Sequence, residues 1–364
     1  MTVTVQAIQD AIQGVIDPHT GKDFVSTKAV KNLTVSGGGD VAFDVELGYP
    51  AKSQIASLRT ALIAAAKGVA GVGNVSVNVT SRIVAHAVQR GVQLLPGVKN
   101  IVAVASGKGG VGKSTTAVNL ALALAAEGAR VGLLDADIYG PSLPMMMGIQ
   151  GRPESADGKT MEPLENHGVQ VMSIGFLVAQ DEAMIWRGPM ATQALEQLLR
   201  QTNWKDLDYL IVDLPPGTGD IQLTLSQRVP MTGAVIVTTP QDIALLDAKK
   251  GIKMFEKVGV PILGIVENMA VHVCSNCGHV EHIFGADGGK KMAAEYNMDY
   301  LGALPLALQI RVQADSGQPT VVADPDGEIA GIYKAVARQV AVSIAARNKD
   351  FSNKFPSITI SKTT

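Results

Sequence analysis

Two cysteines, Cys274 and Cys277, lie three positions apart in the stretch "VHVCSNCGH" and are the only cysteines of the 364-residue chain. A Cys-x-x-Cys pair is typical of a redox dithiol or of half of a metal site. If the pair is half of a metal site, the remaining ligands must come from elsewhere.

Three histidines, His272, His279 and His282, flank the cysteine pair. A mononuclear Cys2His2 zinc site within one chain is therefore an alternative. Its Cys-x2-Cys-x-His-x2-His spacing is more compressed than that of the usual zinc-finger loops. A redox dithiol is a weaker alternative, because the pair does not open a helix in a thioredoxin-like βαβ unit.

A glycine-rich stretch, "SGKGGVGKST", follows the apolar run "NIVAVAS" and precedes the helical run "TAVNLALALAA". Its Gly-x4-Gly-Lys-Ser pattern predicts a loop in which backbone N–H groups and the positive end of a helix dipole surround phosphate oxygens. We expect Lys113 to reach the β- and γ-phosphates and Ser114 to bind Mg2+. The residues expected to form this nucleotide-binding loop are Gly107, Gly109, Gly110, Val111, Gly112, Lys113, Ser114 and Thr115.

Carboxylates at the ends of two further apolar runs complete the predicted nucleotide site. Asp213 ends "DYLIVD", where such folds place a carboxylate that holds Mg2+ through its water shell. Asp135 and Asp137 follow "RVGLL", and either could orient the attacking water. The stretch "LPPGTGD" after Asp213 is suited to sensing a γ-phosphate.

The choice of base follows from Asn268, which comes directly after "PILGIVE". Guanine-specific sites use an Asn-Lys-x-Asp pattern whose carboxylate contacts the guanine edge. Here Val271 occupies the position of that carboxylate. The sequence therefore predicts ATP rather than GTP.

Composition excludes some classes of partner. The formal net charge is −2, and no Lys/Arg cluster is visible, which argues against nucleic acid. The N-terminus lacks the pattern of an export signal, and Glu127 and Arg130 interrupt the most apolar stretch before it reaches membrane-spanning length. We expect a soluble, cytoplasmic protein without a membrane partner, where two close cysteines bind metal or act in catalysis more often than they form a disulfide.

The pattern of apolar residues predicts two folded units. Residues 1–82 read as a small α+β domain with two helices and a hairpin that turns at residues 37–39. Residues 83–98 read as a linker. From residue 99 to 347, near-continuous apolar runs alternate with helices, which predicts a mostly parallel α/β sheet flanked by helices. Residues 348–364 form a polar tail.

A second lysine, Lys108, stands beside the first glycine of the phosphate loop. Together with "DADIYGPS", "WRGP", "IVDLPPGTGD", "ENM" and the cysteine pair, it makes residues 99–345 resemble the Mrp/ApbC-type iron–sulfur cluster carrier ATPases. These belong to the deviant Walker A class of MinD, ParA and the nitrogenase iron protein. Residues 1–82 resemble the MIP18-like domain that is often fused in front, through "VIDPHTGKDFVS".

The resemblance implies roles for single residues. Lys108 becomes the signature lysine that contacts nucleotide across a homodimer interface, Asp137 the catalytic aspartate and Asp213 the Walker B aspartate. Asn268 falls at an adenine-contacting position. The implied catalytic set is Lys108, Lys113, Asp137 and Asp213. Cys274 and Cys277 align with the cluster-binding pair, and the second copy of a homodimer brings the other two thiolates.

Two further features have alternative interpretations. Trp186 and Arg187 either border the dimer or nucleotide site or are an ordinary buried aromatic and a surface charge. Related front domains often carry a cysteine where this chain has Tyr49. The sequence therefore argues against a thiol role for the front domain.

The resemblance predicts a slow ATPase that uses ATP and Mg2+, holds a [4Fe–4S] cluster across a homodimer and transfers it to apo-proteins. One alternative is a MinD/ParA-like positioning ATPase, which acts on membrane or DNA. It leaves the cysteines unexplained, and no basic terminal helix supports it. A reductase like the nitrogenase iron protein is a further alternative, but that family uses cysteines far apart in sequence.

Overall fold

The computed structural model describes residues 3–89, 91–178 and 188–347. Trp186, Arg187 and the predicted tail at 348–364 lie outside the described residues. The helices are α1 (Val5–Gln13), α2 (Ile55–Lys67), α3 (Lys113–Ala126), α4 (Leu143–Met146), α5 (Gly188–Gln201), α6 (Asp220–Arg228), α7 (Asp242–Lys257), α8 (Gly288–Glu295), α9 (Leu308–Asp315), α10 (Thr320–Ala323) and α11 (Glu328–Ala345), with two 3-10 turns, η1 (Lys52–Gln54) and η2 (Ile174–Phe176).

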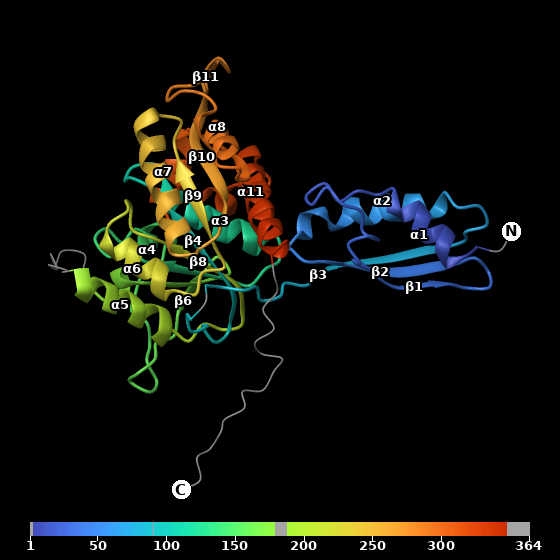
Figure 1. Ribbon diagram of the computed structural model, residues 1–364, viewed down its shortest axis with the longest axis horizontal. Coiled ribbons are helices and arrows are strands. Elements are labelled where there is room, and N and C mark those ends of the chain that lie inside the picture. Colours follow the sequence, from blue (N-terminus) through green and yellow to red (C-terminus); the bar gives the residue numbers. More distant parts are fainter. Residues whose placement is uncertain (1–2, 90, 179–187, 348–364) are drawn as a thin grey trace, which may run out of the picture.

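The strands form two separate sheets, shown in Figure 1. The strands are β1 (Val30–Val35), β2 (Val41–Leu47), β3 (Val75–Ser81), β4 (Val98–Ala105), β5 (Val131–Asp135), β6 (Leu164–Asn166), β7 (Val169–Ser173), β8 (Leu207–Asp213), β9 (Gly233–Thr238), β10 (Ile262–Val273), β11 (Val280–Glu281) and β12 (Tyr300–Pro305).

The smaller sheet is the α+β unit predicted at the front of the chain. Its order is β1-β2-β3, with β1 antiparallel and β3 parallel to β2. Helix α1 begins at Thr4, whose hydroxyl accepts a hydrogen bond from the N–H of Ala7 at 3.2 Å. Ile8 and Ile12, four residues apart, then point into the core. Both predicted helices and the predicted hairpin are confirmed.

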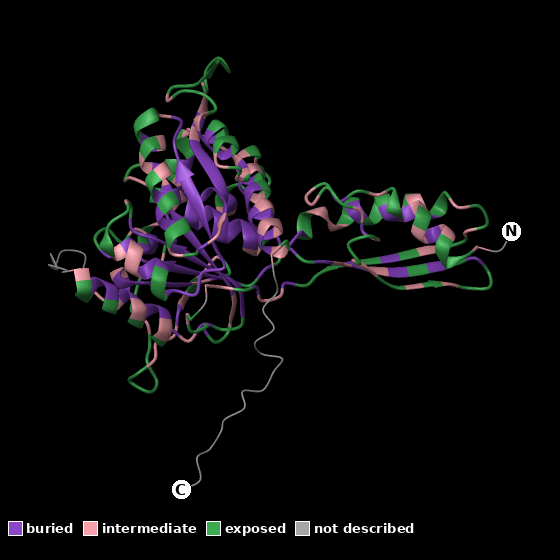
Figure 2. Cartoon of the chain, viewed as in Figure 1, coloured by how far each residue is buried: buried purple, intermediate pink, exposed green. Residues whose placement is uncertain are grey.

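The larger sheet has the order β11-β10-β9-β4-β8-β5-β7-β6, and β12 pairs with β10. All neighbours from β10 to β7 run parallel, and only β6 and β11 are antiparallel to their partners. The central strands β5, β8 and β9 are buried along their whole length, and Figure 2 shows the buried colour along β9. The predicted mostly parallel sheet flanked by helices is confirmed.

The parallel order decides where a site can form, because the carboxyl ends of parallel strands meet at one edge of the sheet. Strand β4 leads into α3 at that edge, and β5 and β8 end beside it at Asp135 and Asp213, which are register partners. Helix α3 is buried almost all round and packs against α11 as well as the sheet. No helix in the described part of the chain has the length and apolar character needed to cross a membrane.

Candidate nucleotide site and cysteine hairpin

The predicted phosphate loop joins β4 to α3 and is held by close backbone contacts. A side chain at Gly107 would place its Cβ 2.1 Å from the carbonyl carbon of Asp247. Gly112 has a φ of 80°, and a Cβ there would lie 2.1 Å from Nδ2 of Asn268. Only glycine fits these two positions, so the loop pattern is a packing requirement as well as a phosphate signature.

Lys113, the first residue of α3, lies between two carboxylates. Its Nζ is 2.7 Å from Oδ1 of Asp213 and 3.7 Å from Oδ2 of Asp137, and it also reaches the hydroxyl of Ser114 at 3.2 Å. Lys113 and Asp213 are both buried. The structure therefore brings together three of the four residues predicted to be catalytic, with the predicted Mg2+ ligand Ser114 beside them.

The buried carboxylates have raised pKa values. Burial, assisted by the negative charge of Asp213, raises the pKa of Asp135 to about 7. Burial also raises the pKa of Asp213 and of Asp137, and the ammonium of Lys113 opposes both shifts. Oδ2 of Asp213 is buried and has no hydrogen-bond partner among the described residues. That oxygen is free to accept from water around a cation, so the donor set suits Mg2+.

The two aspartates after β5 have different environments. Oδ2 of Asp135 accepts hydrogen bonds from the hydroxyl of Ser173 at 3.0 Å and from the N–H of Leu143 at 3.3 Å. Its Oδ1 accepts from the N–H of Asp137 at 3.2 Å. Asp135 thus shapes the turn after β5, whereas the carboxylate of Asp137 faces Lys113 and is partly exposed. This geometry separates the two candidates that the sequence left open.

Asn268 braces the phosphate loop from the side of β10. Its Nδ2 donates to the carbonyl of Val111 at 2.8 Å, and the residue is buried. Its predicted contact with adenine stays a prediction. Lys108 lies in the loop with its carbonyl accepting from the hydroxyl of Ser106 at 2.9 Å, and its side chain is partly exposed. Its role across a dimer interface likewise stays a prediction.

A structural residue that the sequence did not single out is Glu267, next to Asn268. The Glu267 carboxylate is buried in β10 and accepts hydrogen bonds from the N–H groups of Gly289 and Lys290, in the first turn of α8. A carboxylate is favourable at a helix N-terminus. An acidic residue inside an apolar strand run was the available signal for such a buried partner.

The cysteine pair lies in the loop between β10 and β11, which projects beyond the helices in Figure 1. The N–H of Cys274 donates to the carbonyl of His279 and the N–H of Gly278 to the carbonyl of Cys274, each at 2.9 Å. Cys274 is half-buried and Cys277 is exposed. The pKa of the Cys274 thiol is lowered, because the backbone N–H groups of Cys277 and Asn276 hydrogen-bond to its sulfur. The loop therefore favours a thiolate at the surface.

The flanking histidines do not converge on the cysteines. Nδ1 of His272 lies 2.9 Å from the carbonyl of Leu306, and Nδ1 of His282 lies 2.9 Å from the carbonyl of Ala270. In the described ranges, no three or more His, Cys, Asp or Glu side chains are grouped so that they could hold a metal ion. The described residues of one chain therefore do not form the alternative Cys2His2 zinc site.

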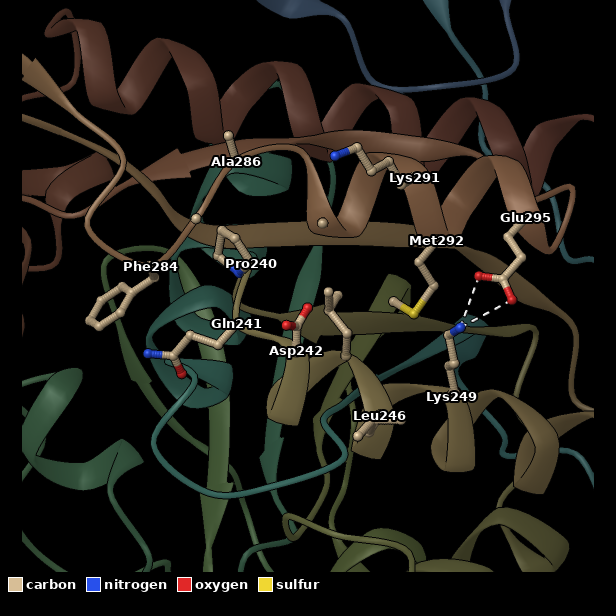
Figure 3. Close-up of a pocket in the computed structure, with 13 residues that line it drawn as sticks. Pro240, Gln241, Asp242, Leu246, Lys249, Phe284, Ala286, Lys291, Met292 and Glu295 are labelled. Atoms are coloured by element: carbon tan, nitrogen blue, oxygen red, sulfur yellow. Dashed lines mark hydrogen bonds and ion pairs between the residues drawn. The ribbon is translucent and has the colours of Figure 1, made fainter.

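A cavity of about 540 Å3 lies between α7 and the segment from Phe284 to α8, just after the cysteine hairpin. Figure 3 shows its apolar side chains, which include Leu246, Phe284 and Met292. Lys249 of α7 reaches Glu295 of α8 at 2.9 and 3.0 Å across one end. No sequence pattern predicts this cavity, because its lining comes from two separate segments of the chain.

A phosphate loop at the start of a buried helix, with carboxylates on the neighbouring parallel strands, defines a P-loop NTPase. The model of the NUBPL iron-transfer P-loop NTPase family matches residues 97–341, and a model described as iron-sulfur cluster assembly protein matches residues 5–79. The chain belongs to the NUBPL iron-transfer P-loop NTPase family. The resemblance found in the sequence is thus confirmed.

Individual relatives agree with this assignment. The iron-sulfur cluster carrier protein of Haemophilus influenzae is 50% identical over 338 residues, which are 93% of this chain and 91% of the relative. That of Pseudomonas fragi is 62% identical over 269 residues, or 73% of this chain and 94% of the relative. A solved nucleotide-binding protein in complex with ADP from Archaeoglobus fulgidus is 37% identical, with a TM-score of 0.56, and covers 64% of this chain and 90% of its own.

Proposed function

We propose that this protein is an ATP-dependent carrier that holds a [4Fe–4S] cluster between two copies of the chain and delivers it to apo-proteins. The observation that carries the proposal is the projecting hairpin with Cys274 and Cys277, built onto a strand of a P-loop NTPase sheet. The names of the relatives support the same function.

Ligand arithmetic supports the shared cluster. A [4Fe–4S] cluster takes four thiolates, and one chain supplies Cys274 and Cys277 only. A twofold axis beside the hairpin would bring the same two residues from a second copy. Val273, Val280 and Ile283 expose apolar surface around the cysteines, which a second copy can cover. A cluster held at such a projecting edge can be passed on to an apo-protein.

At the nucleotide site we assign ATP to the loop from Gly107 to Thr115. Ser114 would bind Mg2+ directly and Asp213 would hold it through water. Mg2+, when bound, neutralises charge on the β- and γ-phosphates. Lys113 would turn from the carboxylates toward the phosphates. Asp137, which is partly exposed and faces Lys113, would orient the attacking water.

The remaining assignments follow from these. Lys108 would contact the nucleotide of the second copy, and Asn268 would contact adenine next to the loop that it braces. Hydrolysis would be slow and would serve cluster transfer. Two free thiols, one of them exposed, favour a reducing compartment, and we therefore assign the carrier to the cytoplasm.

The decisive experiment is metal analysis after anaerobic reconstitution with iron and sulfide. We expect iron and sulfide near four per dimer in the wild type and loss of both in Cys274→Ala and in Cys277→Ala. ATP binding should survive in both variants, because the phosphate loop does not contact the hairpin cysteines. His279→Ala and His282→Ala are the matched controls and should retain iron. One zinc per chain that needs His279 or His282, with no uptake of iron, would contradict the carrier function.

A further inference from the structure

A buried polar cluster joins the front unit to the two long helices of the NTPase unit. Glu127, the residue that ends α3, accepts hydrogen bonds from the hydroxyl of Ser53 at 2.6 Å and from its N–H at 2.9 Å. Nη1 of Arg338, in α11, donates to the same carboxylate at 2.5 Å. Glu127 is 2% and Arg338 8% exposed. The N–H of Lys52 adds a bond to the Glu127 carbonyl at 3.1 Å.

Glu127 is an unfavourable residue for its position unless these partners are present. A carboxylate at the C-terminus of a helix faces the negative end of the helix dipole. A buried ion pair is also stable only when hydrogen bonds satisfy its remaining oxygens. Arg338 supplies one donor, whereas Ser53 supplies two. The NTPase unit alone therefore leaves the carboxylate of Glu127 incompletely satisfied, and the front unit completes it.

The front unit contributes a second contact at Gly48, where an added Cβ would lie 3.4 Å from the Cβ of Ala345 in α11. The hydroxyl of Tyr49 donates to both carboxylate oxygens of Asp17 at 2.7 and 2.8 Å, and its ring meets that of His19 edge-on at 5.8 Å. The pKa of His19 is lowered, first by burial and then by the positive charge of Arg338. Tyr49 thus has a structural role where related domains have a cysteine.

The segment between the two units is itself held on the NTPase unit. Nδ2 of Asn100 donates to the carbonyl of Val84 at 2.9 Å, and Nε2 of Gln89 donates to the carbonyl of Ser226 at 2.9 Å. A connecting segment with such bonds is not a free tether. It leads the front unit to the end of α3, so little chain entropy opposes the contact at Ser53.

We infer that the front unit is a docked arm of the NTPase, and that Glu127 is the residue that holds it. The interaction surface consists of η1 and Gly48 on one side, and of the C-terminal end of α3 with Arg338 and Ala345 of α11 on the other. Helix α3 has Lys113 at its first position and Glu127 just after its last. The nucleotide and the front unit therefore occupy opposite ends of one helix of about 20 Å.

Two amides report this docking directly. The N–H groups of Lys52 and Ser53 open the 3-10 turn η1, where no partner within the turn is available to them. The N–H of Lys52 donates to the main-chain carbonyl of Glu127, and the N–H of Ser53 donates to its carboxylate. Their protection against hydrogen exchange in the full chain therefore depends on docking and on little else.

We would measure hydrogen exchange in the full-length apo chain, which makes the test independent of cluster binding. In the wild type, both amides should exchange at least tenfold more slowly than those of the hairpin turn at residues 37–39. Glu127→Ala should remove that protection, while the amides of the phosphate loop and the affinity for ATP stay unchanged. Glu46→Ala, which breaks an exposed ion pair with Arg82 inside the front unit, is the matched control.

Glu127→Gln keeps the shape of the side chain but removes the charge that Arg338 and Ser53 bind, so docking should weaken and both amides should exchange about tenfold faster, the ratio expected when a hydrogen bond loses its charge assistance. The Glu127→Gln variant tests the docking even if Glu127→Ala also disturbs α3. The inference is wrong if Lys52 and Ser53 exchange as fast as the turn in the wild type. It is equally wrong if their exchange in Glu127→Gln matches that of the wild type.

Discussion

Asp135 should make the stability of the protein depend on pH in a way that an asparagine removes. Its carboxyl group is fully buried, and its pKa rises from the ordinary 3.8 to about 7. The folded protein therefore binds a proton here over a pH range in which the unfolded chain has released it. A raised pKa stabilises the fold fully below the unfolded value, and this contribution is lost as the pH rises through the folded value.

The size of the effect follows from the two pKa values. Each unit of pH between them changes the free energy of unfolding by about 1.4 kcal/mol per proton. Between about pH 5 and pH 7 the Asp135 contribution should fall by roughly 2 kcal/mol, since the curve flattens near the folded pKa. Asp135→Asn is always neutral, so it keeps a constant offset and loses this slope.

The assay is urea unfolding of the nucleotide-free chain at several pH values, followed by circular dichroism. The difference between wild type and Asp135→Asn isolates this carboxylate from the six histidines, which titrate in both proteins. Asp242→Asn, at the exposed start of α7, serves as the control. Parallel curves for wild type and Asp135→Asn would refute the raised pKa. A wild type that gains stability over Asp135→Asn as the pH rises would refute its sign.

The nucleotide site gives three further predictions. Lys113→Ala should weaken ATP binding roughly 100-fold in calorimetry, because the charge that faces the phosphates is lost. Lys108→Ala should retain most of the affinity while losing turnover, and an equal loss of affinity in both variants would rule out action across a dimer. Asp137→Ala should bind ATP but hydrolyse it about 100-fold more slowly in a phosphate-release assay. Unchanged turnover in that variant would move the water-orienting role to Asp135.

The fold could be predicted wherever burial is strong and local. Strands β5, β8 and β9 are apolar throughout because both faces are covered, and this is what their sequences show. The short edge strands β6 and β11 lack that signal, since an edge strand need not be apolar. Strand β10 extends to Val273, beyond the predicted run. The prediction stopped short because polar Asn268 and His272 interrupt the apolar pattern. Contacts to Val111 and Leu306 satisfy those two side chains.

The candidate site was predictable where one motif fixes several residues. The glycine pattern places Lys113 at a helix start, and parallel strand order then brings Asp213 to it. The docking contact was not predictable in this way. Ser53 and Glu127 are 74 residues apart, and Glu127 and Arg338 are 211 apart. Glu127 and Arg338 each read as an ordinary polar surface position in the sequence, and only the packing of α3 against α11 makes them buried.

The way β10 ends has a consequence for how this protein can change over evolution. Strand β10 is paired with β9 up to Glu267 and with β12 up to Val271, and after that only with the short β11. The cysteine hairpin thus projects beyond the part of the sheet in which β10 pairs with β9 and β12. Insertions or replacements between Val273 and Val280 should therefore leave the nucleotide site folded. The cysteine hairpin can therefore change in length or sequence in a few mutational steps, while the glycines of the phosphate loop keep the nucleotide site unchanged.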